Sequence, residues 1–394
     1  MTGDPAGRGA AAIARPRVRR RLLYVVTEDW YFWSHRRHLA ALARTAGWEV
    51  ALATNVTAHG ADIEALGVTL FPMPWRRGGL NPMAEMVTAR ALAKIIRRYE
   101  PDLVHNVALK PILHGLGYPR PLPVVNAVTG VGYAFINADG ARWLSPRRWL
   151  GEAVRVVLAR ALARPGSIAV VQNDDDAALC RQLGVHAGNI ELIPGVGIDL
   201  KAFSPSSLPR RGTLRVALVA RMLWDKGVGE LVEAARHLRD EGVAIEVELV
   251  GGPDPANRAS IAASQLERWV AEGIVQWTGW TDDIPGVWAR ADAAVLPSYR
   301  EGFPKALIEA AACGRALVAT DVPGCRAIVT DGRNGLLVPP RDSVALAEAL
   351  ARLAADRAWC EELGRAARIQ AENEFGMAAI GARFDSVYKR MVAS

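Results

Sequence analysis

Short apolar runs alternate with amphipathic stretches along most of the chain. The segments Arg21 to Val26 and Leu214 to Ala220 are short and mostly apolar, which is typical of buried parallel strands. Each begins a series in which such runs alternate with helical apolar spacing, as in Glu230 to Leu238. This alternation predicts an α/β protein with two Rossmann-like, doubly wound parallel sheets, each covered by helices on both faces.

The length and composition agree with two domains. A chain of 394 residues is long for one core. A hydrophobic content of 51% with 23% charged residues indicates a folded globular protein. Residues 194–212 are rich in turn formers and are predicted to be the linker. We expect one domain over 21–196, another over 208–375, a disordered tail over 1–20 and a final helix over 376–394.

Two carboxylates flank the start of a predicted helix in Glu301-Gly-Phe-Pro-Lys-Ala-Leu-Ile-Glu309. Pro304 favours the first helical turn, and Gly302 lets a ligand approach the backbone. Glu309 then lies about 7.5 Å along the helix axis from Pro304. Such a pair can hold two hydroxyl-bearing rings while N–H groups at the helix start face a phosphate. The alternative is that both acids only stabilise the helix start.

A cationic turn follows the apolar run that begins at Leu214. Arg221 and Lys226 lie between this predicted strand and the next predicted helix. In this position an α/β sheet binds phosphates, and both side chains provide donors for a diphosphate. Either residue is equally typical of a solvated surface. Together with the glutamate pair, they favour sugar transfer from a nucleotide.

The second half of the chain resembles the retaining glycosyltransferases of family 4, which have the two-lobed GT-B fold and an E-x7-E motif. The similarity runs from about residue 214 to 375. It rests on these residues: Arg221, Lys226-Gly227, Gly251-Gly252, Gly279, Glu301-Gly-Phe-Pro with Glu309, Pro323-Gly-Cys-Arg326 and the segment 331–338. The resemblance implies an active site in the cleft between the lobes and a last helix that crosses back to the first lobe.

The resemblance also implies roles for individual residues. Glu301 orients the transferred sugar, Glu309 holds the ribose, and Arg221 and Lys226 stabilise the leaving diphosphate, so that Glu301, Arg221 and Lys226 are the expected catalytic residues. The remaining expected donor contacts are Gly302, Phe303, Pro304, Gly251 and, from the first lobe, Gly130. Retention of anomeric configuration is expected on the same grounds.

The first half contains the expected acceptor residues. Bulky aromatic and histidine residues follow the first strand where related proteins often have a glycine-rich turn. Several relatives place a histidine near Thr129, which leaves His105 and Lys110 as candidates to replace it. The full acceptor-side set is His35, Arg36, Trp33, His105, Lys110 and Thr129. A histidine at a strand end is also commonly structural.

The net charge of +7 points to anionic partners. Residues 142–164 combine arginines, two tryptophans and an apolar stripe, which predicts either an anionic membrane surface as partner or an ordinary packed helix. No zinc finger, RNA-binding signature or continuous basic helix is present, so nucleic acid is not expected.

Metals and disulfides are not expected. The four cysteines have no metal-ligand spacing, and Asp174-Asp-Asp176 is interpreted as a helix start rather than a metal site. The sequence lacks a signal-peptide order and an apolar run of spanning length, which indicates a cytoplasmic protein, at the inner face of the cell membrane if it binds lipid. No cofactor is expected besides the nucleotide-sugar donor.

The favoured function is transfer of a hexose or N-acetylhexosamine from a nucleotide sugar to a lipid-linked or polysaccharide acceptor in cell-surface glycan or lipopolysaccharide synthesis. By resemblance the donor is UDP-linked first and GDP-linked second. Two alternatives stay open: a sugar-nucleotide epimerase of the same architecture, and a non-catalytic subunit that binds a sugar nucleotide.

Overall fold

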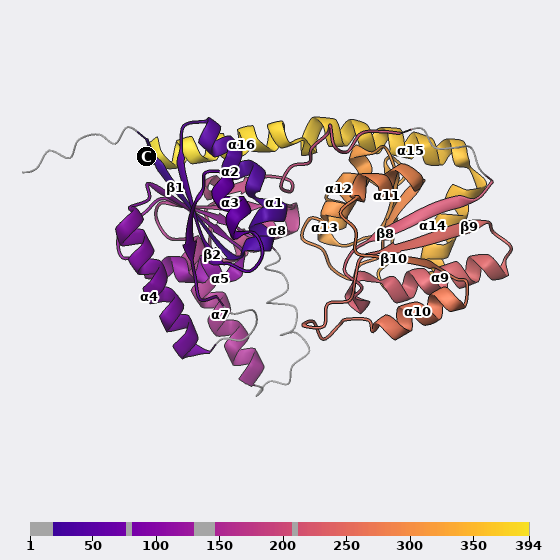
Figure 1. Ribbon diagram of the computed structural model, residues 1–394, viewed down its shortest axis with the longest axis horizontal. Helices are drawn as coiled ribbons and strands as arrows, with labels where there is room; N and C mark the ends of the chain where they lie inside the picture. Colours follow the sequence, from indigo (N-terminus) through magenta and orange to yellow (C-terminus); the bar gives the residue numbers. More distant parts are fainter. Residues whose placement is uncertain (1–18, 76–80, 130–145, 207–211, 394) are drawn as a thin grey trace, which may run out of the picture.

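The computed structural model of the protein describes residues 19–75, 81–129, 146–206 and 212–393. Over these ranges the chain forms two lobes, each built on one parallel sheet (Figure 1). The predicted fold class, two doubly wound α/β lobes, is therefore confirmed.

The first lobe is a seven-stranded sheet of order β3-β2-β1-β4-β5-β6-β7. Its strands are β1 (Arg21–Glu28), β2 (Glu49–Asn55), β3 (Thr69–Pro72), β4 (Leu103–Val107), β5 (Val124–Ala127), β6 (Ser167–Val171) and β7 (Ile190–Leu192). Its helices are α1 (Asp29–His35), α2 (Arg37–Thr45), α3 (Gly60–Ala65), α4 (Pro82–Tyr99), α5 (Leu109–His114), α7 (Pro146–Leu162) and α8 (Asp174–Gln182).

The second lobe is a six-stranded sheet of order β10-β9-β8-β11-β12-β13. Its strands are β8 (Leu214–Val219), β9 (Ile245–Val250), β10 (Gln276–Gly279), β11 (Ala293–Leu296), β12 (Ala316–Thr320) and β13 (Gly335–Val338). The helices that follow β8 are α9 (Val228–Asp240), α10 (Ala263–Ala271), α11 (Ile284–Arg290), α12 (Lys305–Ala312), α13 (Pro323–Arg326), α14 (Ser343–Ala355), α15 (Arg357–Gln370) and α16 (Met377–Ala393).

Each sheet is buried on both faces, which explains why its strands are almost continuously apolar. In β1, Leu22 and Tyr24 belong to the core beneath α2 and α16. Leu23 and Val25 point to the opposite face and belong to the core beneath α4. One apolar run thus serves two cores.

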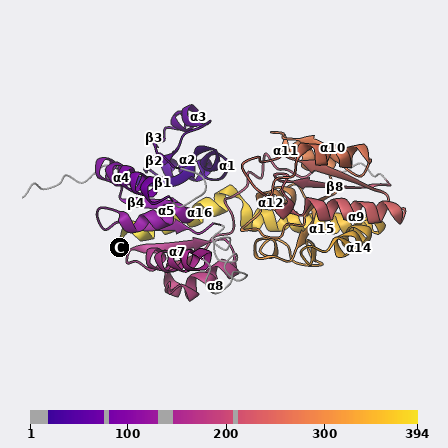
Figure 2. The same ribbon diagram turned by 90° about the horizontal axis from the view of Figure 1, so that it is seen from below.

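Two stretches of chain connect the lobes, and they run side by side. The amide of Ile198 donates to the carbonyl of Phe375 at 2.8 Å, and the amide of Met377 donates to the carbonyl of Ile198 at 3.0 Å. From there α16 runs along the first lobe (Figures 1 and 2), where Phe384 and Tyr388 are buried in its core. The last helix of the chain is therefore an integral part of the first lobe.

Candidate active site

Glu301 lies on the loop between β11 and α12, where the carboxyl end of the second sheet faces the first lobe. Its Oε1 accepts hydrogen bonds from Lys226 Nζ at 2.5 Å and from Ser298 Oγ at 2.6 Å. The Glu301 side chain is only 10% exposed. Two donors on one carboxylate oxygen fix its orientation, and among the described residues no hydrogen bond reaches the second oxygen.

The turn that carries Lys226 is anchored to the same loop. Gly227 adopts the left-handed conformation, with φ of 71°, and a Cβ there would lie 2.1 Å from the carbonyl oxygen of Pro297. Only glycine fits both requirements. The amide of Tyr299 also donates to the carbonyl of Asp225 at 3.0 Å. Backbone contacts therefore fix the positions of Lys226 and Glu301 relative to each other.

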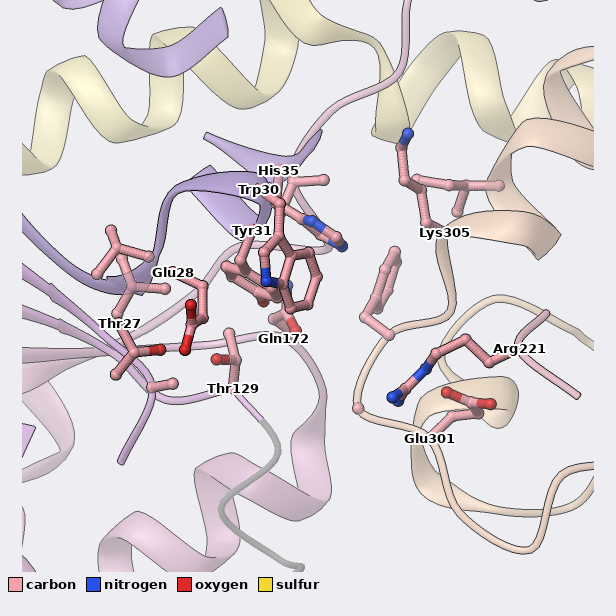
Figure 3. Close-up of a pocket in the computed structure, with 18 residues that line it drawn as sticks. Thr27, Glu28, Trp30, Tyr31, His35, Thr129, Gln172, Arg221, Glu301 and Lys305 are labelled. Carbon is pink, nitrogen blue, oxygen red and sulfur yellow. The ribbon is translucent and has the colours of Figure 1, made fainter. Parts of the chain in front are cut away.

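Arg221 follows β8 and faces the same cleft. Its Nη1 lies 2.6 Å from Asp254 Oδ2, and the side chain is 52% exposed. Figure 3 shows the Arg221 side chain beside Glu301, with the Arg221 guanidinium directed toward the first lobe. Asp254 thus orients the Arg221 guanidinium, and about half of the Arg221 side chain stays exposed to solvent.

Glu309 is buried on α12, one helical turn after Lys305. Lys305 Nζ lies 2.9 Å from Glu309 Oε1. Burial raises the pKa of Glu309, while the charge of and hydrogen bond from Lys305 oppose that shift. Pro304 directly precedes the helix and is its N-cap residue. The structure therefore begins the helix one residue later than the proline-first prediction.

The cleft between the lobes contains a cavity of 460 Å³. From the second lobe it is lined by Arg221, Glu301, Gly302, Phe303, Lys305 and Ile308. From the first lobe it is lined by Val26, Thr27, Glu28, Trp30, Tyr31, His35, Val107, Ala108, Thr129 and Gln172, with Gly195 and Val196 from the interlobe connection (Figure 3). Both lobes thus contribute polar groups to one cavity.

His35 is a neutral group at this cavity. Its ring stacks on Tyr31 with centroids 4.3 Å apart, and Nδ1 lies 2.6 Å from Ser34 Oγ. Burial, together with the nearby charges of Arg36 and Lys305, lowers the pKa of His35 to about 3. Arg36 itself is 1% exposed and does not line the cavity. His35 can therefore donate or accept a hydrogen bond at neutral pH without carrying charge.

Several predicted residues lie elsewhere. His105 is fully buried in β4, and its Nδ1 lies 2.7 Å from the hydroxyl of Tyr388. The prediction that it contacts an acceptor is wrong, because α16 covers it. Lys110 pairs with Glu85 at 2.9 Å and does not line the cavity. Trp33 stacks on His59 with centroids 5.2 Å apart.

Of the predicted glycine contacts, Gly302 lines the cavity and Gly251 does not. Gly251 has a φ of 131°, and a Cβ there would lie 1.9 Å from the carbonyl oxygen of Ala220. Its amide donates to the carbonyl of Gly279 at 2.7 Å. Close packing of strand ends, rather than a ligand, explains this glycine. Gly130 lies outside the described residues.

The two lobes touch beside the Glu301 loop. Asn173 Nδ2 donates to the carbonyl of Gly302 at 2.9 Å, and Arg326 Nη1 lies 3.5 Å from Asp175 Oδ2. The Asn173 side chain also accepts from the amide of Asp176 and so caps α8. The aspartate run therefore begins a helix, as interpreted. Among the described residues, no group of three or more His, Cys, Asp or Glu side chains is arranged to hold a metal.

Sequence reasoning missed four polar residues of the cavity wall: Thr27, Glu28, Gln172 and Lys305. The first three end or follow strands of the first sheet, and the carboxyl edge of a doubly wound sheet is where ligands bind. Lys305 is four positions before Glu309, the spacing of a helical ion pair. Both signals were present in the sequence.

The segment predicted to meet a membrane, residues 142–164, is partly described. In the part of the chain that the structure describes, no helix combines the length and apolar character needed to cross a bilayer. Arg155 and Arg160 are exposed on α7, while Arg142 and Trp143 lie outside the described residues. All four cysteines are buried and free.

Two family profiles match the chain, one for each lobe. The family described as glycosyl transferase 4-like matches residues 21–161, and glycosyl transferases group 1 matches residues 213–356. The N,N'-diacetylbacillosaminyl-diphospho-undecaprenol alpha-1,3-N-acetylgalactosaminyltransferase of Campylobacter jejuni is 28% identical over 342 residues, 83% of this chain and 87% of that protein. The D-inositol 3-phosphate glycosyltransferase of an Arthrobacter species is 29% identical over 370 residues, 85% and 84% of the two chains.

Solved structures share the two-lobed architecture. Sucrose-phosphate synthase from Thermosynechococcus elongatus superposes with a TM-score of 0.79 at 24% identity, over 95% of this chain and 100% of that one. Anabaena HepE in complex with UDP has a TM-score of 0.73 at 16% identity, over 94% and 100% of the two chains. The fold is thus that of the GT-B glycosyltransferases. With a matching family for each lobe, the chain belongs to the GT4-type glycosyltransferases.

Proposed function

We propose that this glycosyltransferase moves a hexose or N-acetylhexosamine from a UDP-linked donor to a lipid-linked or polysaccharide acceptor, with retention of configuration and without a metal. One observation carries the proposal. Arg221 and Glu301, whose carboxylate is paired with Lys226, line one side of a 460 Å³ cavity, opposite the aromatic and polar wall of the first lobe. A charged leaving group and a sugar can be held there together.

The donor's diphosphate binds between Arg221, Lys226 and the start of α12. Negative charge grows on this diphosphate as the glycosidic bond breaks, and cations already held by Asp254 and Glu301 stabilise the transition state without reorganising. These fixed cations take the role that a divalent metal has in other transferases. Chelator treatment should therefore leave turnover unchanged.

Glu301 and Glu309 hold the donor's two rings. The second carboxylate oxygen of Glu301 is available to hydroxyls of the transferred sugar, while Glu309, with its Lys305 partner, meets the ribose. Glu309→Gln removes charge from this buried pair and is expected to weaken donor binding more than turnover. Direct measurement of UDP-sugar affinity separates the two effects.

In the retaining route the acceptor hydroxyl attacks the anomeric carbon on the face that the diphosphate leaves. The bond from that carbon to the phosphate oxygen breaks, the bond to the acceptor oxygen forms, and the hydroxyl proton passes to a donor phosphate oxygen. Glu28 then takes no proton, although it also lines the cavity. Proton NMR of the fresh product, with Glu28→Gln as a comparison, tests this: an inverted anomer, or a loss of turnover in the variant, contradicts retention.

An acceptor that carries phosphate suits the positive side of the cleft. The name of the Campylobacter jejuni relative contains a diphospho-undecaprenol acceptor, and that of the Arthrobacter relative a phosphorylated inositol. Here Lys305 lines the cavity, and the charge of the buried Arg36 acts on His35 in its wall. We therefore infer a lipid-linked diphosphate acceptor, met at the inner face of the membrane.

Membrane contact is assigned to α4 and α7 of the first lobe. Met83, Met86 and Val87 are exposed along α4, and Val156 and Val157 are exposed along α7. Exposed basic residues accompany them, namely Arg90, Lys94, Arg97, Arg98 and Arg160. Apolar side chains beside cations bind anionic lipid surfaces. Co-sedimentation with phosphatidylglycerol vesicles should fall in Met83→Glu and stay unchanged in Trp280→Glu, an exposed residue of the second lobe.

A two-stage experiment tests the function. Thermal melting with UDP, GDP and ADP sugars identifies the donor, because a ligand of the folded form raises Tm. The selected donor is then incubated with and without a polyprenyl-diphosphate sugar. Transfer to lipid supports the proposal. An epimerised donor or binding without any product contradicts it and favours the epimerase or the non-catalytic subunit.

A further inference from the structure

A second cavity lies in the second lobe, at the opposite edge of the sheet from the cleft. Its volume is 590 Å³. Asp292 and Arg315, which line it, directly precede β11 and β12, whereas Glu301 lies beyond the carboxyl end of β11. Since β12 has five residues, the two edges are about 16 Å apart along the strand. The cavity is therefore separate from the candidate active site.

Positive charge dominates this cavity. Four guanidinium groups and two carboxylates line it: Arg315, Arg357, Arg365, Arg368, Asp292 and Glu361. Arg357 pairs with Asp292, and Arg365 reaches Glu361 only at 4.0 Å. Arg368 pairs with Glu372 at 2.7 Å. The lining thus has two more positive than negative side chains.

Arg315 is the unusual member of this set. It is 2% exposed, and among the described residues no carboxylate pairs with it. Its Nη2 donates to the carbonyl and hydroxyl of Ser206 at 2.9 and 2.6 Å, and both acceptors are neutral. Its Nε has no hydrogen-bond partner, and neither has Nη1 of Arg357. A buried cation that no carboxylate contacts is unfavourable, because burial removes its hydration.

The geometry favours an oxyanion as the missing partner. Arg357, Glu361, Arg365 and Arg368 are at positions i, i+4, i+8 and i+11 of α15, which places them on one face of the helix. Figure 1 shows α15 on the side of the second lobe away from α9 and α10. Guanidinium groups that converge from a helix and a strand end match the several oxygens of a phosphate. Burial also lowers the pKa of Arg315, although the charges of Cys313 and Asp292 oppose that shift.

We propose that this cavity, named here the arginine cavity and defined by Arg315, Arg357, Arg365 and Arg368, binds a phosphate-bearing small molecule. Pro205 and Ser206 of the interlobe connection also line it, so the bound anion ties that connection to the second lobe. The competing explanation is purely structural: Arg315 and Arg368 only anchor the connection through Ser206 and Phe203. The two explanations differ in whether phosphate binds.

Inorganic phosphate is the probe, and the full chain is the sample. Tm is measured across phosphate concentrations against chloride at constant ionic strength, in the wild type and in Arg365→Ala at the cavity mouth. Arg239→Ala, which removes an exposed arginine of α9, is the matched loss of charge. We expect a saturable rise in Tm for the wild type, a half-saturating concentration about tenfold higher in Arg365→Ala, and wild-type behaviour in Arg239→Ala.

The cleft needs its own control, because it also has cations. The same titration in Arg221→Ala should retain the phosphate response, whereas a response lost there and kept in Arg365→Ala would assign phosphate to the cleft and overturn the proposal. Absence of any saturable rise overturns it too. Arg315→Met should lose the response; if it does not fold, Arg357→Gln with Arg365→Ala serves instead. No nucleotide sugar is used, so failure here is independent of the proposed transferase activity.

Discussion

The two lobes present different chemistry to the cleft they share. The second lobe presents charged groups that are already paired: Lys226 with Glu301, Lys305 with Glu309, and Arg221 with Asp254. The first lobe presents Trp30, Tyr31 and the neutral His35, with Glu28 as its one charged side chain among the described lining residues.

Paired charges are held in place before any ligand arrives, which is the property that makes electrostatic stabilisation effective. Aromatic rings and neutral polar groups instead suit sugar faces and hydroxyls of varied shape. The difference indicates that the second lobe supplies the chemistry common to such transferases, and that the first lobe selects the acceptor.

Removal of Lys226 should produce the largest effect, because it takes a fixed cation from the leaving group. Lys226→Ala is expected to lower kcat roughly 30- to 1000-fold, which corresponds to a loss of about 2 to 4 kcal/mol of transition-state stabilisation. Single-turnover transfer assays measure it. Lys389→Ala removes an exposed, paired lysine on α16 and should leave kcat unchanged. Full turnover in Lys226→Ala would end the assignment of leaving-group stabilisation to the second lobe.

Asp29 fixes the start of α1, the helix that carries Trp30, Tyr31 and His35 at the cleft. The carboxylate of Asp29, at the start of α1, accepts bonds from the amides of Thr57, Ala58 and His59 at 2.7, 2.8 and 2.9 Å and from the Thr57 hydroxyl at 2.6 Å. Burial alone would raise the pKa of Asp29, but these donors outweigh it and hold the pKa below its usual value.

Because the folded-state pKa of Asp29 is lowered, its stabilisation is present above the unfolded pKa of about 3.9 and is lost as pH falls. Asp29→Asn should therefore reduce the free energy of unfolding by about 2 kcal/mol at pH 7, with a smaller difference at pH 3.5. Urea midpoints at both pH values measure it, and Asp62→Asn, an exposed neighbour, is the control. A difference that stays constant with pH would show that the Asp29 charge is not what holds this loop.

The second-lobe site could be predicted from sequence because its parts are close in the chain. Glu301 and Glu309 are eight positions apart, so a helix between them largely fixes their relative placement. Arg221 and Lys226 likewise follow a single strand. Helix and strand geometry, together with the resemblance to a known family, were sufficient for this region.

The first-lobe site depends on contacts that no local pattern contains. His105 ends up in the core because Tyr388, 283 residues later, packs over it. Trp30 and Trp33 lie on the same short helix α1, yet only Trp30 lines the cavity, because Trp33 packs against His59. Which face of α1 meets the cleft is set by tertiary packing, so the sequence alone could not choose between the two tryptophans.

Substitution of Trp30 sharpens this division of labour. The ring is 38% exposed and lines the cavity from the first lobe. Trp30→Ala should raise the acceptor KM by about fivefold, equivalent to about 1 kcal/mol, with donor affinity unchanged. Trp280→Ala, which removes a 74% exposed ring from the second lobe, is the matched control. An equal loss of donor affinity in Trp30→Ala would mean that the two lobes do not divide donor from acceptor.

The smallest effect is expected at Asn173, where the two lobes are in contact. Asn173 caps α8 with its side-chain oxygen, while its Nδ2 donates to the carbonyl of Gly302 beside Glu301. Serine keeps an oxygen for the cap and loses the donor that reaches across the cleft. Asn173→Ser should therefore lower kcat/KM about threefold, through the loss of one hydrogen bond worth about 0.5 to 1 kcal/mol, with little change in Tm.

Asn81→Ser is the control for capping alone, because Asn81 caps α4 in the same way but lies away from the cleft. If Asn173 acts only as a helix cap, the two variants should lose similar stability and keep the same kcat/KM. If its bond to Gly302 positions the Glu301 loop, only Asn173→Ser loses activity, because that loop then loses a restraint from the first lobe. The comparison therefore decides whether the first lobe contributes to donor chemistry through the backbone of the second.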